Sequence, residues 1–200
     1  MDIQALNRLF GQGSYQDYTL AEYQFLRRFM TLTRPATVAC VGGYTNLDLF
    51  YSCQEIAPRV VNWDTGAHLL GLPMGTMRES QEFLQRETGF QGTYEWVSQT
   101  VKDLRLVGTH DLIWLGGHQA GVYDLKNYPW PTHLIFGHHG RMKWAQAMRH
   151  THDHIPLVVM GRNIAVFSQH DHDWEHMTYN MARCDFLDLR NVREIVELWN

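Results

Sequence analysis

Short apolar runs alternate with amphipathic stretches of helical length along this sequence, and that alternation limits its possible folds more than any other feature. In the clearest case, residues 36–46 read ATVACVGGYTN, so that an apolar, β-prone run ends at two glycines. Residues 46–58 then have the pattern of a helix that stops at a proline, and RVVNWD at 59–64 is typical of a second short strand. This order of strand, glycine turn, helix and strand predicts a βαβ unit.

The alternation continues through most of the remaining chain. Further buried strands are expected where apolar runs break off at glycines, and a hairpin is expected where two such runs flank Gly-Arg-Asn. Strands separated by helices indicate a mostly parallel sheet with helices on both faces. The expected helices or amphipathic stretches are residues 19–32, 78–88, 141–150, 172–182 and 192–199, and the expected strands lie within 93–100, 110–117, 132–140, the 156–169 hairpin and 186–189.

The chain is expected to begin with a helical segment, residues 1–35, ahead of an α/β domain at 36–200. Residues 19–32 repeat apolar side chains three and four positions apart, and Thr19 with Glu22 has the spacing of a capping box. Two hundred residues fit a single globular unit, because a chain of this length buries about 70% of its unfolded surface.

Charge and composition favour a soluble, cytoplasmic protein. The net charge of -4 gives no broad surface for nucleic acid or for an anionic membrane. No run of 18 uncharged apolar residues is present to span a membrane, and the N-terminus has no export signal. Three cysteines without a CxxC pair suit reduced thiols in a cytoplasm.

The two glycines allow two interpretations. Gly42 and Gly43 permit positive φ and close approach of a ligand, and Asp64 lies 22 positions after Gly42, where a carboxylate can bind ribose hydroxyls. Alternatively, any α/β protein needs small residues where a strand turns sharply into a helix. The full GxGxxG pattern is absent, since Tyr44 occupies a glycine position. That side chain would crowd a pyrophosphate more than a nucleoside without phosphates.

The order VACVGGYTN, helix, VVNWD, DLIWLGG and late hairpin resembles that of the class I S-adenosylmethionine-dependent methyltransferases, across residues 36–168. The resemblance implies a Rossmann-like α/β fold with a mostly parallel sheet, a C-terminal antiparallel hairpin and helices on both faces. It also implies S-adenosylmethionine as cofactor and methyl transfer to a small-molecule or protein substrate. The chain departs from the family at three positions: Cys40 replaces the acid that usually precedes the turn, Tyr44 occupies a glycine position, and Asn46 stands where a last glycine is usual.

The resemblance also implies roles for residues at the carboxyl ends of the expected strands. The glycine turn and the residue after it would line the methionine and ribose side of the cofactor. The acid after the second strand would bind the ribose hydroxyls, the end of the third strand would approach adenine, and a glycine after DLIWL would border the crevice. In that order, these residues are Gly42, Gly43 and Tyr44; Asp64; Ser98 and Gln99; and Gly116.

His118 and His138 are the candidate catalytic residues. Each follows an apolar run that ends in glycine, at the edge where catalytic residues of α/β folds collect. Methyl transfer needs an oriented nucleophile and often a base, and histidine suits that task. The alternative is that both histidines cap helices or bind local carbonyls.

Two histidine-rich stretches, 150–154 and 172–176, raise the question of a metal. Strand or helix periodicity would place several imidazoles on one side of each, yet neither stretch has the spacing of a zinc site, and we expect no metal. Two further functions stay open: a catalytically inactive protein of this fold that serves as a structural or binding subunit, and a metal-dependent hydrolase. A homo-oligomer or a larger assembly also stays open.

Overall fold

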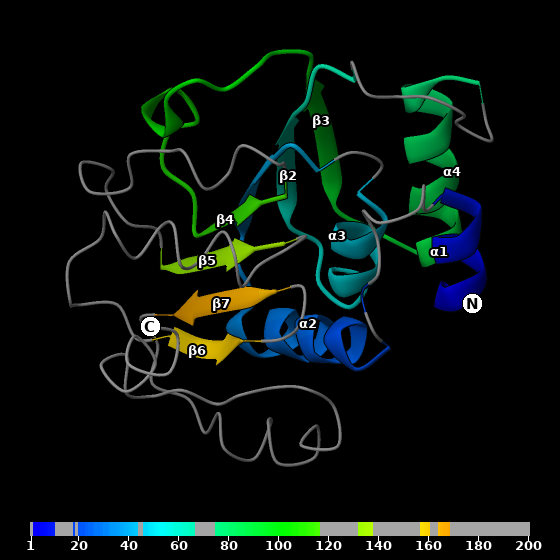
Figure 1. Ribbon diagram of the computed structural model, residues 1–200, viewed down its shortest axis with the longest axis horizontal. Helices are drawn as coiled ribbons and strands as arrows, with labels where there is room; N and C mark the ends of the chain where they lie inside the picture. Colours follow the sequence, from blue (N-terminus) through cyan, green and yellow to red (C-terminus); the bar gives the residue numbers. More distant parts are fainter. Residues whose placement is uncertain are drawn as a thin grey trace, which may run out of the picture.

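A computed structural model of the protein describes residues 2–10, 18, 20–43, 46–66, 75–116, 132–137, 157–160 and 164–168. Seven strands form one sheet in the order β3-β2-β1-β4-β5-β7-β6 (Figure 1). Neighbouring strands from β3 to β5 are parallel, and β7 runs antiparallel to both β5 and β6. The strands are β1 (Thr37–Val41), β2 (Arg59–Trp63), β3 (Thr93–Val97), β4 (Leu112–Leu115), β5 (His133–Phe136), β6 (Leu157–Met160) and β7 (Ala165–Ser168).

The predicted sheet is confirmed. The runs TVACV, RVVNWD, DLIWL and THLIF contain β1, β2, β4 and β5, which lie in one mostly parallel sheet. The predicted hairpin is the β6–β7 pair, at one end of that sheet. Because β1 lies between β2 and β4, the strand order reverses beside β1, and the carboxyl ends of β1 and β4 flank the topological switch point.

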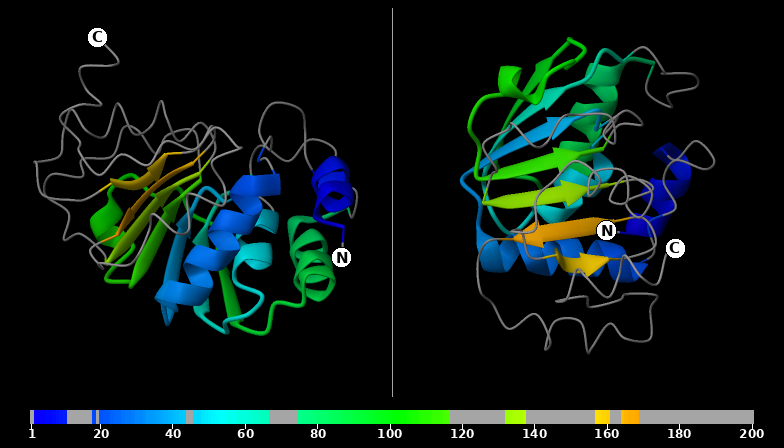
Figure 2. Two further views of the ribbon diagram at one scale, coloured as in Figure 1. Left: turned by 90° about the horizontal axis from the view of Figure 1, so that it is seen from below. Right: turned by 60° about the vertical axis from the view of Figure 1, so that its left-hand side comes forward.

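The described helices gather on one face of the sheet (Figure 2). The contact between α2 and α3 joins the predicted N-terminal segment to the rest of the fold, and the boundary drawn at residue 35 stays a prediction. The elements predicted at 141–150, 172–182, 186–189 and 192–199 lie outside the described residues. The helices are α1 (Ile3–Phe10), α2 (Leu20–Thr33), α3 (Leu47–Ser52) and α4 (Met77–Thr88), and a single 3₁₀ turn, η2, spans Leu104–Leu106.

Helix α3 is shorter than the sequence predicted. It ends at Ser52, although the apolar pattern continues to Pro58. The backbone instead forms a further turn, in which the Ile56 N–H donates to the Cys53 carbonyl at 3.1 Å. Cys53 and Ile56 are both buried, so the apolar residues assigned to the helix pack as a turn that leads the chain into β2.

The core lies between these helices and the sheet. Phe25 and Phe29 of α2 and Phe50 of α3 are fully buried, as is Trp114 of β4. The ring of Phe50 meets the ring of Tyr94 edge-on, with centroids 5.1 Å apart. Packing of these aromatic side chains fixes α2 and α3 against the sheet, and with them the turn that joins β1 to α3.

Helix α4 has clear end signals that the sequence analysis did not identify. Thr76 and Glu79 form a capping box: the Glu79 N–H donates to Thr76 Oγ1 at 3.2 Å, and the Thr76 N–H donates to Glu79 Oε2 at 3.1 Å. Gly89 ends the helix with φ 71°. The capping box predicted from Thr19 falls on a residue outside the described ones.

Candidate functional site

The carboxyl ends of the parallel strands meet at one edge of the sheet, and backbone hydrogen bonds align the residues that follow them. The Gly42 N–H donates to the last carbonyl of β2 at 2.9 Å, and the Gly116 N–H donates to the Val41 carbonyl at 2.9 Å. The Asp64 N–H donates to the Val97 carbonyl at 3.2 Å. Three predicted site residues, Gly42, Asp64 and Gly116, therefore lie at the same level on neighbouring strands.

Close backbone approach explains the glycines at this edge. Gly42 has φ 70°, in the left-handed region that favours glycine. A β-carbon on Gly116 would lie 2.9 Å from the Gly42 carbonyl oxygen, so the end of β4 packs directly against the turn after β1. A β-carbon on Gly43 would lie 1.9 Å from Asn46 Oδ1 and 2.4 Å from Cys40 Sγ. The turn therefore has no room for a side chain at Gly43 or Gly116.

Two of the residues that depart from the family pattern, Cys40 and Asn46, bind each other. Cys40 Sγ donates to Asn46 Oδ1 at 3.2 Å, and both side chains are buried. Asn46 has φ 60°, so an asparagine adopts the left-handed conformation that glycine usually supplies. The two departures form one local arrangement, which sequence reasoning missed because it compared each position with the family separately.

A tyrosine from β3 continues this arrangement beneath the turn. Asn46 Nδ2 donates to Tyr94 Oη at 3.0 Å, and Asn62 Nδ2 on β2 donates to the same oxygen at 3.1 Å. Burial raises the pKa of Tyr94 well above its ordinary value, so its side chain stays a neutral phenol. Neither Tyr94 nor Asn62 was a predicted site residue, and no motif in the sequence marks them.

Asp64 follows β2 with its carboxylate oriented by a local contact. Its Oδ1 accepts the Gly66 N–H at 2.7 Å, and its carbonyl oxygen accepts the Trp96 Nε1–H at 2.6 Å. Ser98 and Gln99 follow β3 directly and are exposed. Because β3 pairs with β2, both residues follow the strand next to the one that Asp64 follows, and their contact with adenine stays a prediction.

The N-terminal segment reaches the same edge. A β-carbon on Gly137, which follows β5, would lie 2.4 Å from Tyr18 Oη. Tyr23 is buried, and its pKa is raised by burial and by the negative charge of Asp48 and Glu22, both of them buried. The sequence analysis assigned none of these side chains to the site, because a helical pattern predicts a buried face and not what that face contacts.

Comparisons with solved structures identify the fold. No protein-family model matches the sequence, and a comparison with curated proteins finds no match. Among solved structures, a Klebsiella pneumoniae protein assigned as an O-methyltransferase aligns with a TM-score of 0.55, at 12% identity, over 83% of this chain and 86% of that chain. The methyltransferase PaMTH1 of Podospora anserina, bound to S-adenosylhomocysteine, aligns with a TM-score of 0.54, at 10% identity, over 84% of this chain and 86% of that chain. The chain has the class I methyltransferase fold.

A third structure of this fold, the O-methyltransferase of Bacillus cereus in complex with S-adenosylhomocysteine, aligns with a TM-score of 0.53 at 12% identity. The alignment covers 84% of this chain and 87% of that chain. At such identities the likeness concerns the fold, so the chemistry has to be argued from the side chains of this chain.

The two candidate catalytic histidines of this methyltransferase fold, His118 and His138, lie outside the described residues, as does Tyr44. The histidine-rich stretches at 150–154 and 172–176 lie outside them as well. Within the described part of the chain, no three His, Cys, Asp or Glu side chains are grouped so that they could hold a metal ion. The catalytic roles and the expected absence of a metal stay predictions.

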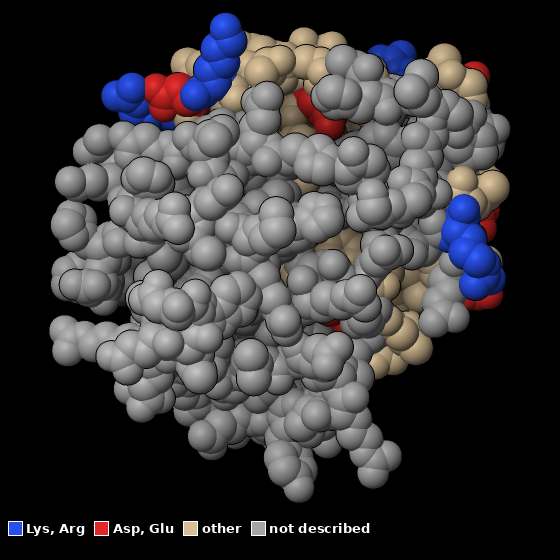
Figure 3. All heavy atoms as spheres, in the orientation of Figure 1, with Lys and Arg blue, Asp and Glu red and all other residues tan. Residues whose placement is uncertain are grey.

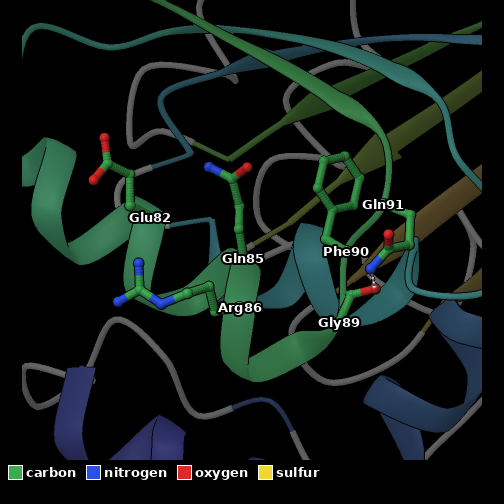
Figure 4. Close-up of a pocket in the computed structure, with 6 residues that line it drawn as sticks. All are labelled: Glu82, Gln85, Arg86, Gly89, Phe90 and Gln91. Atoms are coloured by element: carbon green, nitrogen blue, oxygen red, sulfur yellow. Dashed lines mark hydrogen bonds between the residues drawn. The ribbon is translucent and has the colours of Figure 1, made fainter.

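A shallow hollow lies beside the C-terminal end of α4 (Figure 4). Helix α4 runs antiparallel to the strands that it connects, so this end lies at the amino edge of the sheet, away from the glycine turn. In the hollow, Gln91 Nε2 donates to the Gly89 carbonyl at 3.2 Å. The hollow is therefore separate from the candidate site. Its lining residues are Glu82, Gln85, Arg86, Gly89, Phe90 and Gln91.

The described charges form small mixed groups. On the face in Figure 3, described Lys and Arg side chains lie at the margin with Asp and Glu beside them. Two ion pairs illustrate this mixing, Arg105 with Asp103 and Arg59 with Glu95. No helix in the described ranges combines the length and the apolar character needed to cross a membrane.

Proposed function

We propose that the protein is an S-adenosylmethionine-dependent methyltransferase that acts on a small-molecule or protein substrate. The observation that carries the proposal is the alignment of Gly42, Asp64 and Gly116 on neighbouring strands beside the switch point of the sheet. Open α/β sheets bind their ligands at such a point. Two solved structures of the same fold, from Podospora anserina and Bacillus cereus, contain S-adenosylhomocysteine.

The residues at this edge fit a nucleoside ligand without phosphates. Gly43 has no room for a β-carbon and Gly42 has φ 70°, so both positions of the turn suit glycine, whose lack of a side chain allows a ligand to approach the backbone closely. The Asp64 carboxylate would accept hydrogen bonds from the ribose hydroxyls. Gly43 and Tyr44 would border the methionine part, and Ser98 with Gln99 would border adenine. When bound, S-adenosylmethionine supplies a methyl group on a sulfonium that a nucleophile can attack.

His118 and His138 would act on the acceptor. They follow β4 and β5 by three and two positions in the sequence, soon after Gly116 and Gly137, and in this proposal they would lie at the carboxyl edge. A neutral imidazole there would orient the acceptor and take its proton as the acceptor becomes nucleophilic. Substitution of either histidine by glutamine should therefore lower the rate of methyl transfer and leave cofactor binding unchanged.

A second candidate is a catalytically inactive protein of the same fold that serves as a structural or binding subunit. Cys40 favours it, because this side chain stands where methyltransferases usually have an acid. The candidate predicts that neither form of the cofactor binds. Cys40 and Cys53 are buried and form no disulfide, which suits the reducing cytoplasm proposed for either function. Assembly as a homo-oligomer or with other subunits stays a prediction.

A thermal unfolding experiment tests the proposal. S-adenosylmethionine or S-adenosylhomocysteine at about 100 times its Kd should stabilise the native state by about 2.7 kcal/mol. For a chain of this length, the corresponding rise in Tm is roughly 5 to 11 °C. Asp64→Ala should remove most of that rise, because the ribose hydroxyls lose their acceptor. Glu82→Ala, an exposed change on α4, should retain it.

The two candidates give opposite results in this experiment. If millimolar concentrations of both ligands leave the Tm of the folded, unsubstituted protein unchanged, the methyltransferase proposal is wrong and the inactive subunit is the better description. If the ligands raise the Tm equally in the Asp64→Ala variant, the ligands bind elsewhere.

A further inference from the structure

The turn after β1 contains an asparagine in a conformation that favours glycine. Asn46 has φ 60° and ψ 27° at the start of α3. Its side chain makes no capping hydrogen bond to the helix, which is the usual role of asparagine at this position. Asparagine tolerates the left-handed region better than most residues, but less well than glycine. The side chain must therefore be held by other contacts.

Those contacts fix the side chain of Asn46 at both ends. Its Oδ1 accepts from Cys40 Sγ at 3.2 Å, and its Nδ2 donates to Tyr94 Oη at 3.0 Å. The amide fills the space beside Gly43, where a β-carbon would lie 1.9 Å from Oδ1. Rotation of the Asn46 side chain would break two hydrogen bonds in a buried place, which costs free energy.

Tyr94 is in turn held by residues of β2 and α3. Asn62 Nδ2 donates to Tyr94 Oη at 3.1 Å, and the edge-on contact with Phe50 orients the ring. Asn62 is completely buried, and no described residue donates to its Oδ1. The bond to Tyr94 is therefore the contact that fixes this amide. The hydroxyl of Tyr94 joins two amides from different elements, one on β2 and one at the start of α3.

This network differs from ordinary core packing because it buries polar side chains. Apolar side chains would fill the same volume without the cost of burying two amides and a phenol. A buried network of polar side chains instead favours one local geometry, because its hydrogen bonds form together in a single arrangement. Here the geometry so specified is that of Gly43 and Asn46, in the turn beside the switch point.

We propose that Tyr94 is a positioning residue for the cofactor-binding turn, and that the network of Cys40, Asn46, Asn62 and Tyr94 replaces the acid and the last glycine of the usual motif. This inference rests on the proposed function, because the turn is a binding element only if the cofactor binds there. Tyr94 acts through Asn46 and does not touch the cofactor.

The substitution Tyr94→Phe tests the role directly. It removes the hydroxyl that both amides bind and keeps the ring against Phe50. The matched control is Thr88→Val, which removes another buried hydroxyl, bonded to the Leu84 carbonyl at 2.7 Å in the last turn of α4. The Kd for S-adenosylhomocysteine is measured by calorimetry on the full chain, at a temperature where both variants are folded.

Tyr94→Phe should raise this Kd by about ten-fold, the typical effect of leaving buried donors without their acceptor. Thr88→Val should lower the Tm and leave the Kd unchanged. If the Kd of Tyr94→Phe equals that of the unsubstituted protein, the proposed role of Tyr94 is wrong and the cofactor proposal stands. If the unsubstituted protein does not bind the ligand, the proposed function is wrong, and the role of the turn is wrong with it.

A double-mutant comparison tests whether the network acts as one unit. Asn46→Gly accepts the left-handed conformation but makes none of the side-chain hydrogen bonds. In a connected network, the double variant Asn46→Gly, Tyr94→Phe should bind S-adenosylhomocysteine about as weakly as the single variant with the higher Kd, to within about two-fold. If the fold-change in Kd of the double variant equals the product of the two single fold-changes, the residues do not act as one network.

A measurement without cofactor complements the affinities. The Asn46 N–H donates to the Gly43 carbonyl at 2.9 Å inside the turn. Amide hydrogen exchange at Asn46 should become faster in Tyr94→Phe and stay unchanged in Thr88→Val, because the first variant frees the turn and the second does not. Equal exchange rates in the two variants would show that Tyr94 does not hold the turn.

Discussion

At the amino edge of the sheet a side chain binds the backbone directly, whereas at the carboxyl edge side chains support the turn after β1 through hydrogen bonds to one another. Asp111 Oδ2 accepts the N–H groups of Ala36 and Thr37, each at 2.9 Å, and the Thr37 hydroxyl at 3.0 Å. In the same region, His133 Nδ1 and Ser168 Oγ lie 2.9 Å apart and join β5 to β7. The Asp111 carboxylate thus satisfies two backbone N–H groups, and the contact of His133 with Ser168 links two strands through their side chains.

The carboxyl edge uses side chains differently. The turn after β1 has left-handed residues at Gly42 and Asn46, and the polar side chains that support it lie beneath the turn instead of capping it. Substitutions at the amino edge should therefore change the free energy of unfolding without changing ligand affinity. Substitutions at the carboxyl edge should change affinity at least as much as stability.

The largest effect is expected for Gly43→Ala, at the carboxyl edge. The new β-carbon would overlap Asn46 Oδ1 and Cys40 Sγ, so the turn and the network must both move. We expect the free energy of unfolding to fall by about 1–3 kcal/mol. The ligand-induced rise in Tm with S-adenosylhomocysteine should disappear, which thermal unfolding with and without ligand would measure.

Gly89→Ala is the matched control for Gly43→Ala at the other edge. Gly89 has φ 71°, and a β-carbon there would meet no atom within 4 Å, so the change adds backbone strain without a collision. It should cost about 1–2 kcal/mol of stability and leave the ligand-induced rise in Tm intact. If Gly43→Ala also retained the full rise in Tm, the contrast between the two edges would be wrong.

The register of the parallel strands explains which features could be predicted from the sequence. Parallel strands place their carboxyl ends at one edge, so the predicted strands were enough to bring Gly42, Asp64 and Gly116 together. The alternation of apolar runs and helices was likewise enough for the strand neighbours, because short β-branched runs that end at glycines and alternate with helices favour strands of one parallel sheet.

The supporting contacts could not be predicted, because they depend on register between distant segments. Val38 pairs with Leu112, which brings Asp111 beside Thr37 although 74 positions separate them in the sequence. Val60 pairs with Tyr94, which places the Tyr94 hydroxyl within reach of Asn62, two residues farther along β2. No local sequence pattern predicts which residues of two distant strands are paired.

The second prediction concerns Asp111→Ala, at the amino edge. The substitution removes one acceptor from two backbone N–H groups and one hydroxyl at the start of β1. We expect a loss of about 2 kcal/mol in the free energy of unfolding, measured by urea denaturation. The Kd for S-adenosylhomocysteine should stay within about two-fold of that of the unsubstituted protein, since the change lies at the far edge. A ten-fold weaker Kd would contradict the separation of the two edges.

The smallest expected effect is a dependence of the free energy of unfolding on pH, which arises from the carboxylate of Asp111. Burial works to raise the pKa of Asp111, but the hydrogen bonds from Thr37 and Ala36 outweigh it, so the pKa lies below its ordinary value. Because the folded pKa is lowered, the ionised carboxylate contributes fully above the unfolded-state pKa of about 3.9. That contribution disappears as the pH falls through the folded pKa.

Asp111→Asn isolates this contribution, because the amide keeps an acceptor oxygen and cannot titrate. The difference in the free energy of unfolding between the two proteins should narrow as the pH falls below about 4. Glu55 and Asp103 also have lowered pKa values, through hydrogen bonds from Arg27 and Arg105, but both proteins contain them, so their titration cancels in the difference. Urea denaturation at a series of pH values gives the free energies. A difference that stays constant down to about pH 3 would mean that the charge of Asp111 contributes nothing, and that the amino edge depends only on the shape and hydrogen bonds that asparagine also provides.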